Sequence, residues 1–335
     1  MIPSSPLITI LINNYNYEKY LGEAIDSALA QTYSRVEVVV VDDGSSDRSR
    51  EIMQAYGDKI HAVFKENGGQ ASAINAGFQQ STGDIIMTLD SDDYLEPFAC
   101  ERIVANWSPD FEMLFHRLRQ VRNGKKLESY LPHRRLAMVS GDMVPQLLSQ
   151  GRYVCPPTSG LSFSRKLMQA IMPIPESEYR ICADNYLRLH GAFLGRVRAL
   201  EETLVYYRVH SFNNFDAGTP RRLLTRPKLK ERQRHRNQSY NLLKQIAEAR
   251  HLSLASQNSS YRARDIFEEM MLVAGDPGAS LGSRLRMAWK TICKIGREAE
   301  YGWYHRFREM AQVFLLVVGP RILLKKIYPG LYVAE

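Results

Sequence analysis

The sequence predicts an α/β protein: a doubly wound, mostly parallel sheet with flanking helices, followed by a helical C-terminal extension. Two observations support this fold class. Over 7–90, short apolar runs alternate with segments of helical periodicity, the pattern of strand–helix units joined by right-handed crossovers. From about residue 218 onward, no segment favours a strand. We therefore expect a sheet domain over 1–217 and a helical, basic, amphipathic region over 218–335.

The first half of the sheet domain is predicted from its apolar runs. Continuous apolar runs are typical of parallel strands that are buried on both faces. The expected strands are 7–13, 36–41, 60–64 and 84–90. Helical spacing of apolar residues predicts helices over 18–30 and 70–80. A further helix is predicted to run to Tyr56, with Ser46 or Asp47 as its N-cap.

After Pro97 the pattern changes to longer polar strands and turns. Asn123-Gly124 predicts a hairpin between 111–121 and 126–131. Further on we expect a loop over 151–160, a short strand over 161–163, a helix capped by Ser164, a helix over 183–194 and a strand over 204–209.

Composition limits the partners and the cellular setting. The 335 residues carry 44 basic and 36 acidic side chains, which gives a net charge of +8 and favours anionic partners such as phosphates, acidic lipid surfaces or nucleic acid. The four cysteines form no CxxC pair, so we expect reduced thiols, a cytoplasmic setting and no structural zinc. We also expect neither a signal peptide nor a membrane-spanning helix.

Three carboxylates follow the apolar run 85–89. Asp90 and Asp92 point to one side of an extended chain, and Asp93 follows them. Clustered carboxylates repel one another unless a cation lies between them, and a hard divalent ion prefers oxygen ligands. Asn13 and Asp43 end two other strands, so all these side chains can face one crevice at the carboxyl edge of the sheet. The alternative is a solvated acidic turn.

The C-terminal region is basic and, near its end, strongly apolar. Basic residues crowd 221–236, which usually indicates a solvated helix face. The stretch 310–328 is the most apolar of the chain, with Arg321, Lys325 and Lys326 beside it, which suits a helix lying on a membrane surface. The alternatives are a helix packed on its own domain or a contact in a homo-oligomer.

The ordered motifs resemble family 2 glycosyltransferases with the GT-A fold. The motifs are Asn13-Asn14-Tyr15-Asn16, Val41-Asp42-Asp43-Gly44-Ser45, Asn67-Gly68-Gly69-Gln70 with Asn75-Ala76-Gly77, Gly83-Asp84 and Leu89-Asp90-Ser91-Asp92-Asp93. The resemblance is close over 7–98, looser to about 212, and implies a nucleotide-binding half over 7–98 and an acceptor half over 99–217. It also implies an inverting, metal-dependent enzyme that moves a sugar from a nucleotide-diphosphate sugar to a hydroxyl acceptor.

The resemblance implies a donor site in the first half. Asp43 would accept a hydrogen bond from the nucleotide base, with Asn13, Asn67 and the stacking face of Tyr15 beside it. Asp90 would contact the ribose or the metal.

The resemblance also implies the remaining site residues. Asp92 would ligate Mn²⁺ or Mg²⁺, with Asp90 nearby, and His210 would complete the metal site. Asp184 would be the general base, while Ser159 and Gly160 belong to a loop on the acceptor side.

Two departures from the family pattern stand out. Ala183 stands where the family usually has Glu, and Ile74 stands where many members have an arginine that can contact the diphosphate.

Other functions are also open. Asp90-x-Asp92 after an apolar strand resembles the nucleophile motif of haloacid-dehalogenase-type phosphatases, although that motif stands near the start of its domain. Asp42-Asp43 resembles a receiver domain, which leaves the glycine-rich turns unexplained. A non-catalytic nucleotide-sugar-binding protein is a further alternative. A nucleic-acid partner is not expected, because no recognisable nucleic-acid-binding module is present. A lipid-linked or cell-envelope glycan is the acceptor that the basic tail favours.

Overall fold

The structure is a computed structural model that describes residues 3–210, 225–255, 268–273, 276, 279–297, 303–318 and 327. The chain divides into two compact units: Met1–Pro145 with Tyr153–Asn214, and Gln146–Arg152 with Phe215–Glu335. The division predicted at residue 217 falls among residues that are not described, and it stays a prediction. Much of the apolar stretch 310–328 also lies outside the described residues.

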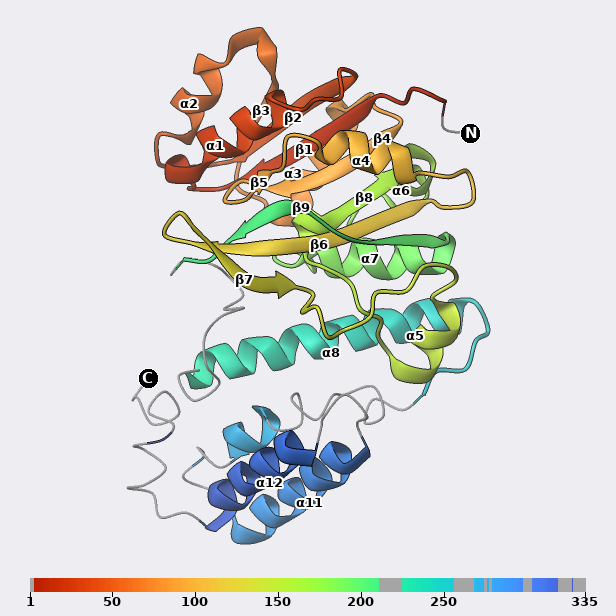
Figure 1. Cartoon of the computed structure of the whole chain (residues 1–335). Helices are drawn as coiled ribbons and strands as arrows, with labels where there is room; N and C mark the ends of the chain where they lie inside the picture. Colours follow the sequence, from red (N-terminus) through yellow and green to blue (C-terminus); the bar gives the residue numbers. More distant parts are fainter. Residues whose placement is uncertain are drawn as a thin grey trace. The chain divides into compact units, whose positions relative to one another are not determined.

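The first unit contains a nine-stranded sheet in the order β3-β2-β1-β4-β8-β6-β9-β5, with β7 paired to β6 (Figure 1). The first four strands in chain order are parallel to one another, as predicted. They are β1 Ile8–Asn14, β2 Val36–Asp43, β3 His61–Lys65 and β4 Ile85–Asp90. The remaining strands are β5 Tyr94–Leu95, β6 Met113–Arg122, β7 Lys125–Leu131, β8 Leu161–Ser164 and β9 Val197–Arg208.

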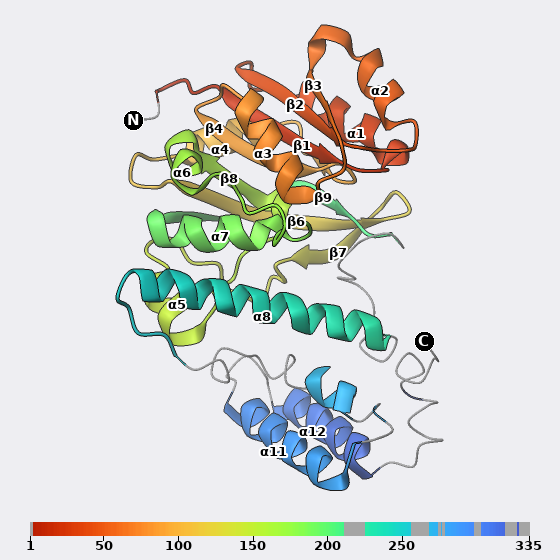
Figure 2. The same ribbon diagram turned by 180° about the vertical axis from the view of Figure 1, so that it is seen from behind.

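Helices cover both faces of this sheet (Figures 1 and 2). They are α1 Glu18–Leu29, α2 Ser49–Ala55, α3 Gln70–Gln80, α4 Ala99–Asn106, α6 Arg165–Ile171 and α7 Ala183–Leu194, with short 3₁₀ turns at Gly57–Lys59 and Thr158–Gly160. Helix α5, Val144–Gln150, lies where the two units divide. The described helices of the second unit include α8 Arg226–Ala249, α11 Leu281–Arg297 and α12 Trp303–Val318.

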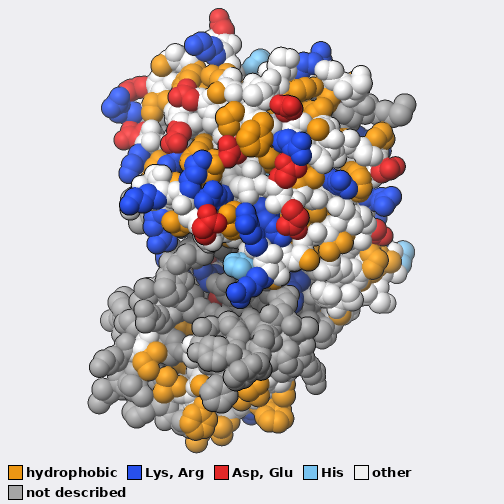
Figure 3. Space-filling model, viewed as in Figure 1, with side chains coloured by type: hydrophobic (Ala, Val, Ile, Leu, Met, Phe, Trp, Pro, Cys, Tyr) orange, Lys and Arg blue, Asp and Glu red, His pale blue; other side chains and the backbone are white. Residues whose placement is uncertain are grey.

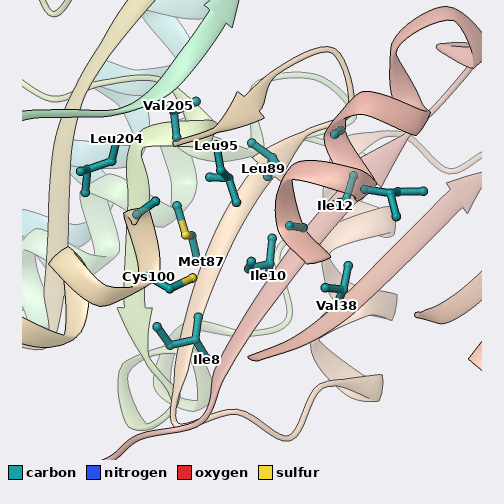
Figure 4. Packing of buried hydrophobic residues seen from close by; sticks show 14 of the residues in the cluster. Ile8, Ile10, Ile12, Val38, Met87, Leu89, Leu95, Cys100, Leu204 and Val205 are labelled. Carbon is teal, nitrogen blue, oxygen red and sulfur yellow. The ribbon is translucent and has the colours of Figure 1, made fainter. Parts of the chain in front are cut away.

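Alternation along the central strands builds the core. Ile8, Ile10 and Ile12 of β1 point to one side, where they join residues of β2, β4, α1 and α4 in one buried cluster (Figure 4). On the other side, α3 approaches the sheet closely at Gly77, where an added Cβ would lie 2.9 Å from both Leu11 Cγ and Val41 Cγ2. A residue without a side chain therefore lets α3 pack onto β1 and β2.

Several predicted elements are confirmed to within a few residues, including α3, α7 and the β6–β7 hairpin. The Ser164 cap is confirmed, because its Oγ accepts a hydrogen bond from the Leu167 backbone N–H. The predicted start of α2 differs by one residue, because Arg48 occupies the N-cap position and its side chain gives no cap. Asp47, one of the two predicted caps, accepts from the backbone N–H of Ser49, the first residue of the helix, and also from that of Glu18.

The second half of the sheet departs from the expected boundaries. Strand β9 begins at Val197 rather than residue 204, because its first residues also pair with β6. Several polar side chains in this early part are partly exposed, so it contains no continuous apolar run. Strand β8 runs antiparallel to β4 and to β6, whereas β9 runs parallel to β6. Helix α4 and strand β5 were not among the predicted elements. Of the described helices, none has the length and apolar content needed to cross a membrane.

A buried arginine ties β6 to the loop that follows β7. Arg117 is 1% exposed, and its Nε and Nη2 donate to the carboxylate of Glu201 at 2.6 and 3.0 Å. Its remaining N–H groups donate to the carbonyl oxygens of Pro132, His133 and Leu136. One guanidinium thus satisfies three carbonyl groups that no regular strand pairs.

We expect Arg117→Met to lower the free energy of unfolding by about 2–3 kcal/mol, because the carbonyl groups of Pro132 and Leu136 lose their donor. Urea unfolding followed by circular dichroism measures the change. Arg119→Met is the matched control: Arg119 lies on the same strand, is partly exposed and pairs with the exposed Glu128. Its expected cost is about 1 kcal/mol or less. Equal costs for the two variants would contradict this account.

Candidate functional site

The candidate site lies where the parallel strands end. In the sheet register Asn13 of β1 is paired with Asp90 of β4, and Asn14 with Asp42 of β2. Asn13 Nδ2 donates to Asp90 Oδ1 at 3.1 Å. Because these strands run in the same direction, their polar terminal residues gather at one edge of the sheet, as the sequence predicts.

The three carboxylates Asp90, Asp92 and Asp93 lie at and just after the end of β4, and their negative charges repel one another. Asp92 and Asp93 are buried, and Asp90 is partly exposed. Burial and the neighbouring charge of Asp92 raise the pKa of Asp90 to about 7. Burial and the charges of Asp92 and Asp90 raise the pKa of Asp93 well above its usual range. A cation beside Asp90 and Asp92 would relieve this repulsion.

His210 lies beside this cluster although it is far from it in sequence. Its Nε2 is 2.9 Å from Asp92 Oδ2. The imidazole stacks on the ring of Tyr20 with centroids 4.9 Å apart, and it meets the edge of Tyr17 at 5.7 Å. Burial, followed by the charges of the three acids, raises the pKa of Tyr17, so its hydroxyl stays protonated. Asp92 Oδ2 and His210 Nε2 therefore lie within hydrogen-bond distance of each other, and both kinds of atom can ligate a divalent metal ion.

Asp93, whose role the sequence leaves open, holds the loop after β4 in place. It accepts hydrogen bonds from Ser159 Oγ at 2.6 Å and from the Arg208 backbone N–H at 2.9 Å. Ser159 Oγ also accepts from the Asp90 backbone N–H at 3.1 Å. Ser159 is fully buried, so its contacts link the acidic loop to the 3₁₀ turn Thr158–Gly160. Whether this turn also meets the acceptor stays a prediction.

Arg208 is a site residue that the sequence motifs did not assign. Its Nε donates to the Asp92 backbone carbonyl at 2.8 Å, and its Nη2 donates to Glu23 at 2.6 Å. The guanidinium lies over the rings of Tyr20 and Tyr94, at 4.7 and 5.2 Å from their centroids. No local pattern identifies these partners, since they come from α1, β5 and the acidic loop.

Asp43 organises the glycine-rich turn that follows β3. Its Oδ1 accepts from Lys65 Nζ at 2.7 Å and from the Gly68 backbone N–H, and its Oδ2 accepts from Asn67 Nδ2 and the Gly69 backbone N–H at 2.6 Å. These four donors occupy the lone-pair directions of the carboxylate. The predicted contact of Asp43 with a nucleotide base would therefore replace one of these donors.

The other predicted residues are distributed around this edge. Tyr15 follows β1 with a 48% exposed ring, which leaves its face accessible. Gly160 is enclosed, and an added Cβ would lie 2.6 Å from Pro156 Cγ, so the glycine serves close packing here. Asp184 lies in the first turn of α7, near enough to Asp90 for its charge to contribute to the raised pKa of Asp90. Gln70 links the two parts, because its side chain contacts both Asp90 and the backbone N–H of Ala183, the residue before Asp184.

Within the described ranges, no group of three His, Cys, Asp or Glu side chains is arranged to hold a metal ion. Asp92 and His210 could supply two ligands, so a cation held there would need further oxygen atoms from Asp90, water or a bound substrate.

Comparison with known proteins identifies related sequences and folds. Residues 9–167 match the profile of Glycosyl transferase family 2. An uncharacterized glycosyltransferase of Nostoc sp. is 39% identical over 213 residues, which cover 62% of this chain and 66% of that protein. The match therefore spans slightly less than two thirds of that relative.

Two solved structures share the fold at low sequence identity. S. aureus TarS, solved with UDP-GlcNAc, has a TM-score of 0.51 at 14% identity and covers 94% of this chain and 92% of its own. The mannosyltransferase PcManGT from Pyrobaculum calidifontis, in complex with GDP-Man and Mn²⁺, has a TM-score of 0.50 at 15% identity and covers 97% and 85%. The predicted GT-A fold class is confirmed.

We expect Ser159→Ala to lower the free energy of unfolding by about 1–3 kcal/mol, because the buried Asp93 loses a donor and the Asp90 N–H loses its acceptor. Chemical denaturation measures the loss. Ser162→Ala is the matched control, since Ser162 is equally buried but its Oγ has no hydrogen-bond partner. Its removal should change stability by about 0.5 kcal/mol or less. A Ser162→Ala cost as large as that of Ser159→Ala would refute the role given to the Asp93 network.

Proposed function

We propose that this chain, which carries a family 2 glycosyltransferase domain of the GT-A fold, transfers a sugar from a nucleotide-diphosphate sugar to a hydroxyl acceptor with inversion. The observation that carries this proposal is the meeting of Asp90, Asp92 and His210 with Asp184 at one edge of the sheet. The first three suit a diphosphate with its cation, and the fourth suits the acceptor.

The donor pocket is assigned to the edge formed by β1 and β2. Tyr15 offers an exposed ring for stacking on a base, and Asn13 lies against Asp90. The turn Asn67–Gly69, held by Asp43, forms the other wall. The nucleotide sugars bound to TarS and PcManGT, UDP-GlcNAc and GDP-Man, support this class of donor.

Asp92 and His210 would hold a divalent cation, Mn²⁺ or Mg²⁺, with Asp90 beside them. When bound, such a cation neutralises the negative charge that develops on a leaving nucleoside diphosphate. Two protein ligands leave room for diphosphate oxygens in its coordination sphere. Mn²⁺ in the PcManGT complex supports this cofactor. Arg208 contributes by fixing the backbone of Asp92.

Asp184 would accept the proton of the acceptor hydroxyl. A carboxylate within hydrogen-bond reach of that hydroxyl raises its nucleophilicity as the C–O bond forms. Attack from the side opposite the leaving diphosphate, in a single displacement, inverts the anomeric carbon. The presence of a base candidate beside the acidic cluster favours catalysis over the alternative of a non-catalytic nucleotide-sugar-binding protein.

A lipid-linked or cell-envelope glycan is proposed as the acceptor, delivered at a membrane surface on the cytoplasmic side. In the second unit, Leu281, Leu285 and Trp289 recur along one side of α11 and are 62%, 51% and 70% exposed. Figure 3 shows exposed hydrophobic side chains on the described part of this unit. The buried side of α11, with Ala288 and Ile295, packs in a core shared with α12.

The charge of α11 supports an anionic lipid surface. Its sequence, LGSRLRMAWKTICKIGR, has five basic residues and no acidic one. Basic residues beside an exposed stripe with a tryptophan suit the headgroup region of an anionic bilayer.

Asp184→Asn should lower kcat by about 100-fold or more, because the acceptor hydroxyl loses its base. Donor affinity should stay within about threefold, since Asp184 would act on the acceptor. Steady-state kinetics with the donor found by screening, together with calorimetric donor binding, measure both quantities. Asp110→Asn is the control, an acid in an exposed turn. Unchanged kcat in Asp184→Asn would remove this residue as the base.

The underlying screen uses the wild-type chain with nucleotide sugars, with Mn²⁺ or after chelation. The expected result is donor hydrolysis and donor-dependent thermal stabilisation that chelation abolishes and Mn²⁺ restores. Absence of any response to every donor in the presence of Mn²⁺ would overturn the proposed activity.

Leu285→Gln combined with Trp289→Gln should reduce co-sedimentation with phosphatidylglycerol-containing vesicles about tenfold or more, since each substitution removes apolar area from the headgroup region. Binding by the wild type should weaken with added salt and be absent on neutral vesicles. Val139→Gln, which changes an exposed apolar residue of the first unit, is the control. Equal pelleting of all three proteins would exclude α11 as the binding surface. Dimerisation of the wild type that the double variant abolishes would indicate a protein contact instead.

A further inference from the structure

One amide side chain contacts three elements around the candidate site. Gln70 is the first residue of α3, and its Nε2 donates to Asp90 Oδ1 and to Thr158 Oγ1, both at 3.2 Å. Its Oε1 accepts from the backbone N–H of Ala183, the first residue of α7, at 3.0 Å. Gln70 therefore joins the end of β4 to the start of the helix that carries Asp184.

The chain is built to let these elements approach. The Gln70 backbone N–H donates to the Arg180 carbonyl at 2.8 Å, which docks the segment before α7 onto the start of α3. Gly69 has φ 90°, and an added Cβ there would lie 2.5 Å from the Arg180 carbonyl oxygen. Only a glycine permits this backbone conformation together with this approach.

Helix α7 depends on Gln70 for part of its N-terminal capping. Its N-cap residue, Cys182, has a left-handed backbone with φ 64° and gives no side-chain cap. The first backbone N–H groups of a helix have no partner within the helix, so they need an acceptor from elsewhere. Gln70 Oε1 supplies one at Ala183, directly before Asp184.

The two ends of the amide are not interchangeable. Asp90 Oδ1 accepts hydrogen bonds, and the Ala183 N–H donates one, so a reversed amide would face a carboxylate with its oxygen and an N–H with its own N–H groups. The orientation of Gln70 is therefore fixed by both partners at once. It sets the first turn of α7 against Asp90.

We propose that Gln70 is a positioning residue that acts on turnover through Asp184, by fixing the first turn of α7 relative to Asp90. This inference rests on the proposed function, in which Asp184 is the base. Displacement of a reacting group by about 1 Å can cost about 100-fold in rate, so loss of these contacts should affect the chemical step more than donor binding.

The first test compares Gln70→Leu with Gln79→Leu, which places the same substitution on an exposed position of the same helix. In Gln70→Leu we expect kcat to fall about 10- to 100-fold while the donor KM changes by about threefold or less. Gln79→Leu should retain wild-type values for both. Wild-type kcat in Gln70→Leu would overturn the proposal, and so would a loss confined to the donor KM.

A double-mutant cycle separates a positioning role from a general loss of structure. If Gln70 acts through Asp184, adding Gln70→Leu to Asp184→Asn should lower kcat by no more than about twofold further. Losses that multiply would show that Gln70 acts independently of Asp184, against the proposal. If Asp184→Asn is too slow to measure, Asp184→Glu takes its place in the cycle. Absence of turnover in the wild type would reject the proposed function itself, which is a different outcome from normal kcat in Gln70→Leu.

Discussion

The site depends on holding three acidic side chains close together at the end of one buried strand. Asp90, Asp92 and Asp93 repel one another in a setting where burial already disfavours their charged forms. The protein assigns each a different set of partners. Asp93 is enclosed by Ser159 and the Arg208 backbone, Asp92 meets His210, and Asp90 accepts side-chain amide hydrogen bonds. Asp93, the most buried of the three, thereby holds the loop in place, while Asp90 and Asp92 are the two acids proposed to hold a cation.

The topology explains how distant residues reach this loop. Strand β9 pairs with β6 along much of its length and with the short β5, which directly follows the acids. That pairing brings Arg208 to the loop and leaves His210 just beyond the strand end. The rings of Tyr17 and Tyr20, from the start of α1, then restrict the imidazole. The position of His210 beside Asp92 thus depends on strand pairing as much as on the Asp-x-Asp sequence.

The sequence was sufficient for features that repeat locally. The parallel strands, α3 and α7 followed from apolar periodicity, and the motif residues followed from family resemblance. Contacts between distant segments gave no such signal. The partners of Gln70 and Arg208, and the Asp93–Ser159 pair, became visible only when the strands were placed side by side. The early part of β9 was missed because its polar, partly exposed residues break the apolar run.

The close packing at Gly77 has a consequence for how this site can change. Helix α3 lies against Leu11 and Val41 with no space for even a methyl group, and its first residue contacts both Asp90 and α7. A larger side chain at position 11 or 41 would therefore push α3 away from the sheet and move Gln70 at its N-terminus. Substrate preference could therefore drift through substitutions in the hydrophobic interior, leaving every residue that lines the crevice unaltered. Laboratory evolution of this enzyme class should therefore include the buried residues that pack between α3 and the sheet.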